Sequence, residues 1–132
     1  MMEKDKNIIV VSADMGFNTF EPLRDKFKER FINTGVSEAN AAGVSAGLAL
    51  SGYTVFLYAQ ASFVTLRCFE QIRLDIASNN LNVKIVGTSS GFTLSQYGVS
   101  HFALEDVAAM RSLPNMTVMC PGDLYEAEEI TK

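Results

Sequence analysis

The sequence predicts an α/β fold in which a mostly parallel sheet of about five strands lies between two layers of helices. Two observations lead to this prediction. Short runs rich in β-branched residues, of which Ile8 to Val11 is the clearest, alternate along the chain with longer segments of helical periodicity. That first run is apolar throughout, which is typical of a strand covered on both faces. Alternating strands and helices form a parallel sheet with helices on both sides.

Each element is placed by its own pattern. Strands are expected at residues 8–11, 31–33, 53–58, 83–87 and 116–120, and helices at 20–30, 37–51, 62–77, 104–113 and after 123. In the second helix Gly43 and Gly47 each cost about 1 kcal/mol, so they predict close approach to another backbone. In the third helix one face is expected to be apolar. Its members are Phe63, Leu66, Phe69, Ile72 and Ile76.

Length and composition indicate one domain over residues 1–132, cropped at both ends, because the chain starts almost on its first strand and stops inside its last helix. The net charge of −4 argues against nucleic acid and anionic membrane surfaces as partners. The polar N-terminus lacks the apolar core of a signal peptide, and we therefore expect a cytoplasmic protein. In that compartment Cys68 and Cys120, each among apolar neighbours, are expected to be buried, reduced thiols. With one histidine and no CxxC or HExxH spacing, no metal site is expected in this chain.

Four places could carry chemistry, and spacing alone leaves two interpretations of each. Glu38, after the turn at 33–37, could bind a ligand or simply cap a helix. Phe63 could line a site or pack in the core. The loop at 87–101 is rich in Ser and Gly but matches no phosphate-binding fingerprint, and His101 at its end could be catalytic or structural. The acidic pair Glu105 and Asp106 is expected to be a solvated helix start.

Taken together, the segments resemble the pyrimidine-binding (Pyr) domain of the transketolase family, which uses thiamine diphosphate. The resemblance rests on RFINTGVSE at 30–38, AGLALSG at 46–52, FEQIR at 69–73, GVSH at 98–101, and ALED and LPNM at 103–106 and 113–116. The order and spacing hold from about Ile8 to the C-terminus. In this family the active site forms between a Pyr domain and a diphosphate-binding domain. The resemblance therefore implies an oligomer with a diphosphate-domain subunit, which holds the Mg or Ca ion.

The resemblance also implies roles for individual residues. A glutamate at the position of Glu38 binds N1′ of the cofactor's aminopyrimidine. Its hydrogen bond favours the 4′-imino tautomer, whose nitrogen removes the proton from C2 of the thiazolium. Phe63 matches the aromatic that stacks on the pyrimidine, and His101 a histidine that reaches the sugar phosphate or related ketose or aldose substrate. Gln71 and Arg73 are expected to be structural.

Three positions depart from the family pattern. The family's Gly-Glu-Asp-Gly before the histidine is replaced by residues 95–98, which puts Tyr97 where an acidic residue contacts substrate. Ser89 replaces a histidine, and Gln60 lies within the stretch that replaces Ser-Thr-Phe. These changes indicate either a substrate other than an ordinary sugar phosphate or the loss of sugar chemistry.

Three hypotheses follow for the function. The first is a Pyr subunit or fragment of a split transketolase-like enzyme that transfers two-carbon ketol groups only with its partner. The second is a degenerate or cropped Pyr module with an assembly or regulatory role. The third is an unrelated α/β domain that binds a small molecule at the carboxyl ends of its strands.

Overall fold

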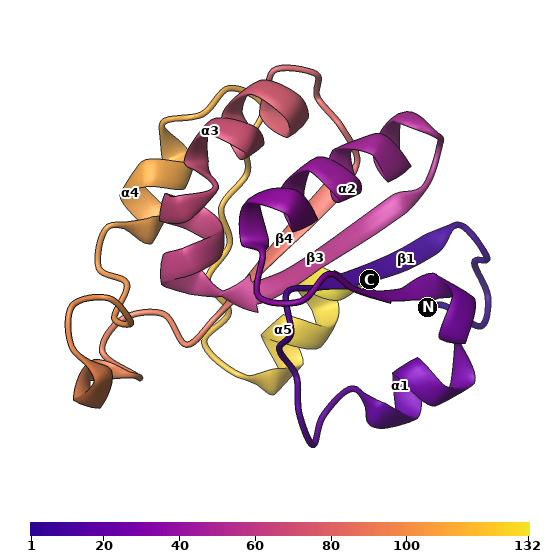
Figure 1. Ribbon diagram of the computed structural model, residues 1–132, viewed down its shortest axis with the longest axis horizontal. Coiled ribbons are helices and arrows are strands. Elements are labelled where there is room, and N and C mark those ends of the chain that lie inside the picture. Colours follow the sequence, from indigo (N-terminus) through magenta and orange to yellow (C-terminus); the bar gives the residue numbers. More distant parts are fainter.

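The protein, described by a computed structural model of residues 1–132, is built on a parallel sheet of four strands (Figure 1). The order across the sheet is β2-β1-β3-β4, and every neighbouring pair is parallel. Val11 lies at the same level as Ile32 on one side and Leu57 on the other. The predicted α/β class is confirmed, with four strands rather than about five. The strands are β1 (Ile8–Ser12), β2 (Phe31–Asn33), β3 (Thr54–Gln60) and β4 (Val83–Thr88).

The prediction of a strand at 116–120 is wrong, because this segment pairs with no strand. Met116 and Val118 nevertheless pack against the main core as partly buried side chains. These two residues alternate with exposed ones because one side of the segment rests on the core. Packing against the core thus produces the same alternating pattern as a strand, without strand pairing.

The helices agree with the predicted order but are shorter than expected. The helix predicted at 20–30 is interrupted at Phe27, where ψ is 47°. The helices are α1 (Glu21–Lys26), α2 (Glu38–Leu50), α3 (Phe69–Gln71), α4 (Asp106–Arg111) and α5 (Leu124–Thr131). Short 3₁₀ turns occupy Lys28–Arg30 and Ser95–Tyr97, and π-helical turns flank α3 at Phe63–Arg67 and Ile72–Ala77. No helix has the length and apolar character needed to cross a membrane.

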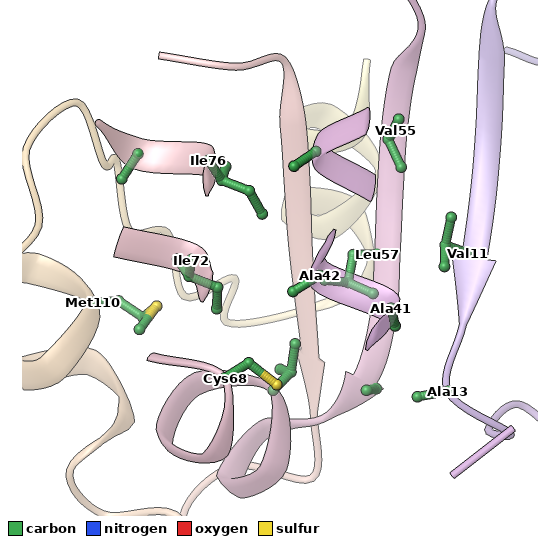
Figure 2. Close-up of a cluster of buried hydrophobic side chains, with 14 of the residues drawn as sticks. Val11, Ala13, Ala41, Ala42, Val55, Leu57, Cys68, Ile72, Ile76 and Met110 are labelled. Carbon is green, nitrogen blue, oxygen red and sulfur yellow. The ribbon is translucent and has the colours of Figure 1, made fainter. Parts of the chain in front are cut away.

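The main core lies between one face of the sheet and the helices α2, α3 and α4. Figure 2 shows Val11, Val55 and Leu57 of the strands opposite Ala41 and Ala42 of α2 and the apolar side chains of the α3 region. On the other face Ile8 and Val10 form a smaller cluster with Met2, against which Leu23 and Phe27 pack. Successive residues of β1 thus point to opposite cores, which explains why this strand is apolar throughout.

The predicted helix at 62–77 is not a regular α-helix, and this changes which side chains face the core. Val64, Cys68, Ile72 and Ile76 are buried at intervals of four residues. A helix of 3.6 residues per turn rotates such a series steadily away from a flat surface, whereas wider i→i+5 turns correct the rotation. The expectation for Leu66 was therefore wrong, since it is 39% exposed, while Ile72 and Ile76 are buried as expected.

The expected helix at 37–51 is confirmed as α2, but the close approach expected at its glycines does not occur within this chain. A Cβ added at Gly43 or Gly47 would meet nothing within 4 Å, and both residues are exposed. The buried face of α2 is instead lined by Ala41, Ala42 and Ala46, whose short side chains bring the helix close to the sheet.

The helical register at 62–77 predicts unequal costs for two truncations. Ile72→Ala is expected to lower the free energy of unfolding by about 2 to 5 kcal/mol, because it leaves a cavity in the main core. Leu66→Ala, the matched control from the face that periodicity alone assigns to the core, is expected to cost less than about 1 kcal/mol. Urea unfolding of the two variants and the wild type measures both values. Equal costs would contradict the π-helical register.

Candidate functional site

The candidate site lies at the carboxyl edge of the sheet. The chain leaves β1 toward α1 on one face, and it leaves β3 toward α3 on the other face. Because β1 and β3 are neighbours, their connections diverge there, and such a point is where open α/β sheets bind ligands. Glu38, Phe63 and His101 follow the carboxyl ends of β2, β3 and β4 in that order.

A hydrogen-bonded turn holds Glu38 at the start of α2. The Oδ1 atom of Asn33 accepts from the backbone N–H of Asp14 at 3.1 Å and of Gly35 at 2.9 Å. The Thr34 backbone N–H donates to the carbonyl of Ser12 at 2.9 Å. Gly35 has a φ of +73°, a conformation that a residue with a Cβ adopts only with strain. Asn33, Thr34 and Gly35 thus join the ends of β1 and β2 and direct the chain into the helix.

The Glu38 carboxylate is buried and paired with a residue for which the sequence offered no role. Glu38 is 3% exposed, and its Oε2 accepts from an Nη atom of Arg67 at 2.8 Å. Its position in the first turn of α2 adds a favourable interaction with the helix dipole. Oε1 accepts no hydrogen bond from the protein, and no buried side-chain oxygen or nitrogen lacks a partner. Oε1 therefore keeps a small accessible surface, although the side chain as a whole is only 4% exposed.

Phe63 lies beside this pair rather than in the core. The Arg67 guanidinium stands over the Phe63 ring at 4.1 Å from its centroid, a cation–π contact. Phe63 is partly exposed and does not belong to either buried cluster. The interpretation of Phe63 as a core residue is thus wrong; its partly exposed ring lies between the Arg67 guanidinium and the His101 ring.

His101 completes the group from the loop after β4. Its ring packs edge-on against Phe63, with the centroids 5.2 Å apart, and its Nδ1 lies 2.9 Å from the Ser100 hydroxyl. Gln60 at the end of β3 is 4% exposed and donates to the His101 carbonyl at 2.8 Å. The Ser62 hydroxyl accepts from Gln60 at 3.1 Å. Gln60 therefore holds the loop that carries His101 against the end of β3.

The two other unusual positions lie in the same loop. The Tyr97 ring is 5.1 Å from that of His101 and is largely exposed. Ser89, just beyond β4, has a φ of +58°. Asp106 is buried, contrary to expectation, and accepts the Ser90 hydroxyl at 2.5 Å, whereas Glu105 is exposed. Asp106 thus fastens the start of the loop to α4.

Cys68 lies behind the ion pair. Burial raises the pKa of its thiol from 9.0 to about 11, and the neighbouring Glu38 charge acts in the same direction, with Arg67 opposing them. Its Sγ lies 3.5 Å from the Phe63 carbonyl. A thiol in this state is protonated and unreactive at neutral pH. Both cysteines are free thiols, but only Cys68 is buried; Cys120 is exposed, contrary to expectation, because the segment at 116–120 rests on the core with one side only. No three His, Cys, Asp or Glu side chains gather as a metal-binding cluster.

The structure therefore brings together Glu38, Phe63 and His101 and adds Arg67 between the first two. Gln71 and Arg73 take no part in this group; Arg73 is exposed. Arg67 was missed because its partner is 29 positions away in the sequence. The available signal was the interval of four between Phe63 and Arg67, which places them on one side of a helical turn.

The fold and this site define a parallel α/β domain with an acidic and aromatic site at the carboxyl edge of its sheet. Residues 1–132 match the model of the transketolase pyrimidine-binding domain, and the chain belongs to this family. The resemblance seen in the sequence is thereby confirmed, and thiamine diphosphate is the cofactor that the family implies.

Relatives of the chain include proteins of split transketolases. It is 41% identical to a putative transketolase C-terminal section of Methanocaldococcus jannaschii over 98% of this chain and 42% of that protein. It is 35% identical to one of the subunits of the apulose-4-phosphate transketolase of Phocaeicola vulgatus, over 100% of this chain and 43% of that protein. A solved split-gene transketolase, an inactive β4 tetramer, matches with a TM-score of 0.84 and 41% identity over 97% of this chain and 41% of its own. The chain thus spans less than half the length of these relatives.

The raised pKa of Cys68 predicts a loss of stability in alkali. Between about pH 9 and 11 the unfolded chain releases the thiol proton while the folded chain keeps it, so the free energy of unfolding falls as the pH rises. Two pKa units correspond to about 2 to 3 kcal/mol. Urea unfolding at pH 8 and pH 11 measures the change, with Cys68→Ala as the control that lacks this thiol. An equal pH dependence in both proteins would show that Cys68 does not contribute.

Proposed function

We propose that this chain supplies the aminopyrimidine-binding half of a thiamine-diphosphate site for two-carbon ketol transfer, and that it turns over only with a partner that carries the diphosphate-binding domain. The observation that supports this most directly is the buried Glu38 carboxylate with one accessible oxygen beside the Phe63 ring. Residues 1–132 act in this proposal as one Pyr domain, and the partner holds the Mg or Ca ion. We assign the complex to the cytoplasm.

The residues of the site fit the aminopyrimidine part of the cofactor. An aminopyrimidine has a flat aromatic face and a ring nitrogen that shares a proton with a carboxylate. Phe63 provides an aromatic surface, and the Oε1 atom of Glu38 provides an acceptor that no protein group occupies. In the bound state thiamine diphosphate supplies the thiazolium carbon at which carbon–carbon bonds of the sugar are broken and made.

Each residue then has a defined task. The Glu38 Oε1 atom holds the proton shared with N1′ and so sets the tautomer of the ring. The Phe63 ring orients the aminopyrimidine by stacking. The His101 imidazole, whose Nδ1 is engaged by Ser100, keeps Nε2 for a hydroxyl group of the sugar. Tyr97 lies next to His101, where the family has an acidic residue, so we propose a substrate that differs from an ordinary sugar phosphate.

A second candidate is an assembly module without catalysis, and the exposed face of α2 favours it. Leu50 at the end of α2 is more than two-thirds exposed, as is Val36 just before the helix begins, and Gly43 and Gly47 lie between them in the sequence with open space above. A glycine face allows the backbone of another helix to approach closely. The same face also serves the first proposal, which requires a partner, so cofactor-dependent turnover of the assembled complex distinguishes the two.

The role of Glu38 predicts a large effect of Glu38→Gln. In the complex with its diphosphate-domain partner, this variant is expected to lower kcat by roughly 10²- to 10⁴-fold, because an amide cannot share the N1′ proton. Steady-state turnover with thiamine diphosphate, magnesium, a ketose donor and an aldose acceptor measures it. Glu70→Gln, at an exposed position on α3, is the control and is expected to leave kcat unchanged. Full turnover by Glu38→Gln would refute the proposed function.

The exposed glycines predict that alanine at these sites stabilises the fold and that leucine at these sites blocks assembly. Alanine at Gly43 and Gly47 is expected to raise the free energy of unfolding of the chain, by up to about 1 kcal/mol per site, because it improves helix propensity where space is open. Leucine at both sites is expected to leave the isolated chain folded but to prevent association with the partner. Circular dichroism and sedimentation velocity measure the two properties. Unchanged assembly of the double leucine variant would exclude this face as the contact surface.

A further inference from the structure

Arg67 makes two contacts with the residues of the proposed site, one to the acid and one to the aromatic ring. Its guanidinium donates to the Oε2 atom of Glu38 at 2.8 Å and stands 4.1 Å from the centroid of the Phe63 ring. The two contacts use different properties of a guanidinium, since the N–H edge binds the carboxylate while the planar face lies on the ring. Arg67 is thus the side chain that joins the Glu38 carboxylate to the Phe63 ring.

The geometry at Glu38 leaves one carboxylate oxygen, Oε1, without a protein partner. Arg67 engages Oε2 alone, and Oε1 is the accessible atom without a protein partner. A buried carboxylate without a second contact could rotate about its terminal torsion, which is broad for glutamate. A charge-assisted hydrogen bond to one oxygen removes this freedom and directs the other oxygen outward. The ion pair thus presents Oε1 in one orientation.

The π-helical turn Phe63–Arg67 explains how Arg67 reaches this position. Val64 and Cys68 are fully buried and hold the turn against the core, so the intervening side chains of Leu66 and Arg67 point outward. The Arg67 side chain is 49% exposed, although its carboxylate partner is 4% exposed. π-helical turns occur frequently at functional sites, where they displace side chains from the regular register.

From these contacts we infer that Arg67 is a positioning residue, which fixes the Glu38 carboxylate and the Phe63 ring in the orientations that receive the aminopyrimidine. This inference rests on the proposed function for the identity of the ligand. Arg67 itself acts through its two neighbours and need not touch the reacting atoms. The contacts also allow the opposite effect, in which Arg67 occupies the place of the aminopyrimidine, and the affinity of an Arg67 variant for the cofactor separates the two.

Arg67→Met tests the inference in the complex with the diphosphate-domain partner. Methionine keeps an unbranched side chain but removes the charge and the planar donor group. We expect the Kd of thiamine diphosphate, measured by titration calorimetry, to rise and kcat to fall by roughly 10- to 100-fold. The KM of the sugar acceptor is expected to stay the same. Arg73→Met, which removes an exposed arginine from the π-helical turn Ile72–Ala77, is the control. It is expected to change neither the Kd of the cofactor nor kcat.

Rescue by a conservative variant distinguishes positioning from general support of the fold. Arg67→Lys keeps the positive charge without the planar fork, so it is expected to recover part of the lost affinity and turnover. A purely structural role would instead lower the melting temperature of the chain without changing the Kd of the cofactor in the folded complex. A Kd for Arg67→Met that equals the wild-type value, or a tighter one as expected if Arg67 occupies the ligand's place, would overturn the inference.

A second measurement needs no cofactor. If Arg67 acts through Glu38, the thermal unfolding of the chain should show coupling between them, with the double variant Glu38→Gln/Arg67→Met melting at a temperature above that expected from adding the two single shifts. Additive shifts would contradict the inference. Full turnover of Glu38→Gln would instead refute the proposed function, while loss of turnover in Glu38→Gln with normal binding by Arg67→Met would refute only the role of Arg67.

Discussion

The ion pair between Glu38 and Arg67 joins two helical elements that contact the sheet through the same core. Glu38 begins α2, and Arg67 ends a π-helical turn that is anchored by Val64 and Cys68. A salt bridge to a buried carboxylate contributes little unless the surrounding backbone brings the two charges together beforehand. The packing of both elements on β3 provides this alignment, so the geometry of the site depends on the core beneath it.

Both helical elements of the site bury one side against the core and expose the other. In α2, alanines face the sheet while Gly43 and Gly47 face outward. In the segment that follows β3, Val64 and Cys68 face the core while Phe63 and Arg67 reach the carboxyl edge. In α2 the short alanine side chains on the core side let the helix lie close to the strands, whereas the segment after β3 buries larger side chains such as Ile72. The outer side of both elements remains available for a ligand or a partner.

The loop after β4 is held by polar contacts rather than by a core of its own. Gln60 binds the His101 carbonyl, and Asp106 binds the Ser90 hydroxyl. Between these two points the loop exposes apolar side chains, among them Phe92 and Val99. The placement of His101 beside Phe63 therefore depends on buried polar residues at the ends of neighbouring elements. Gln60 and Asp106 thereby have a structural explanation that requires no contact with substrate.

The sequence by itself determined the α/β class, the order of the elements, the family, and the location of Glu38 at a helix start, because these depend on local periodicity and on motifs of consecutive residues. The tertiary structure decided the rest. Whether residues 116–120 pair as a strand, and which side of 62–77 faces the core, depend on contacts between distant segments. The contact between Arg67 and Glu38 could not be predicted from the sequence for the same reason. A separation of 29 residues is closed only when both elements pack on one sheet.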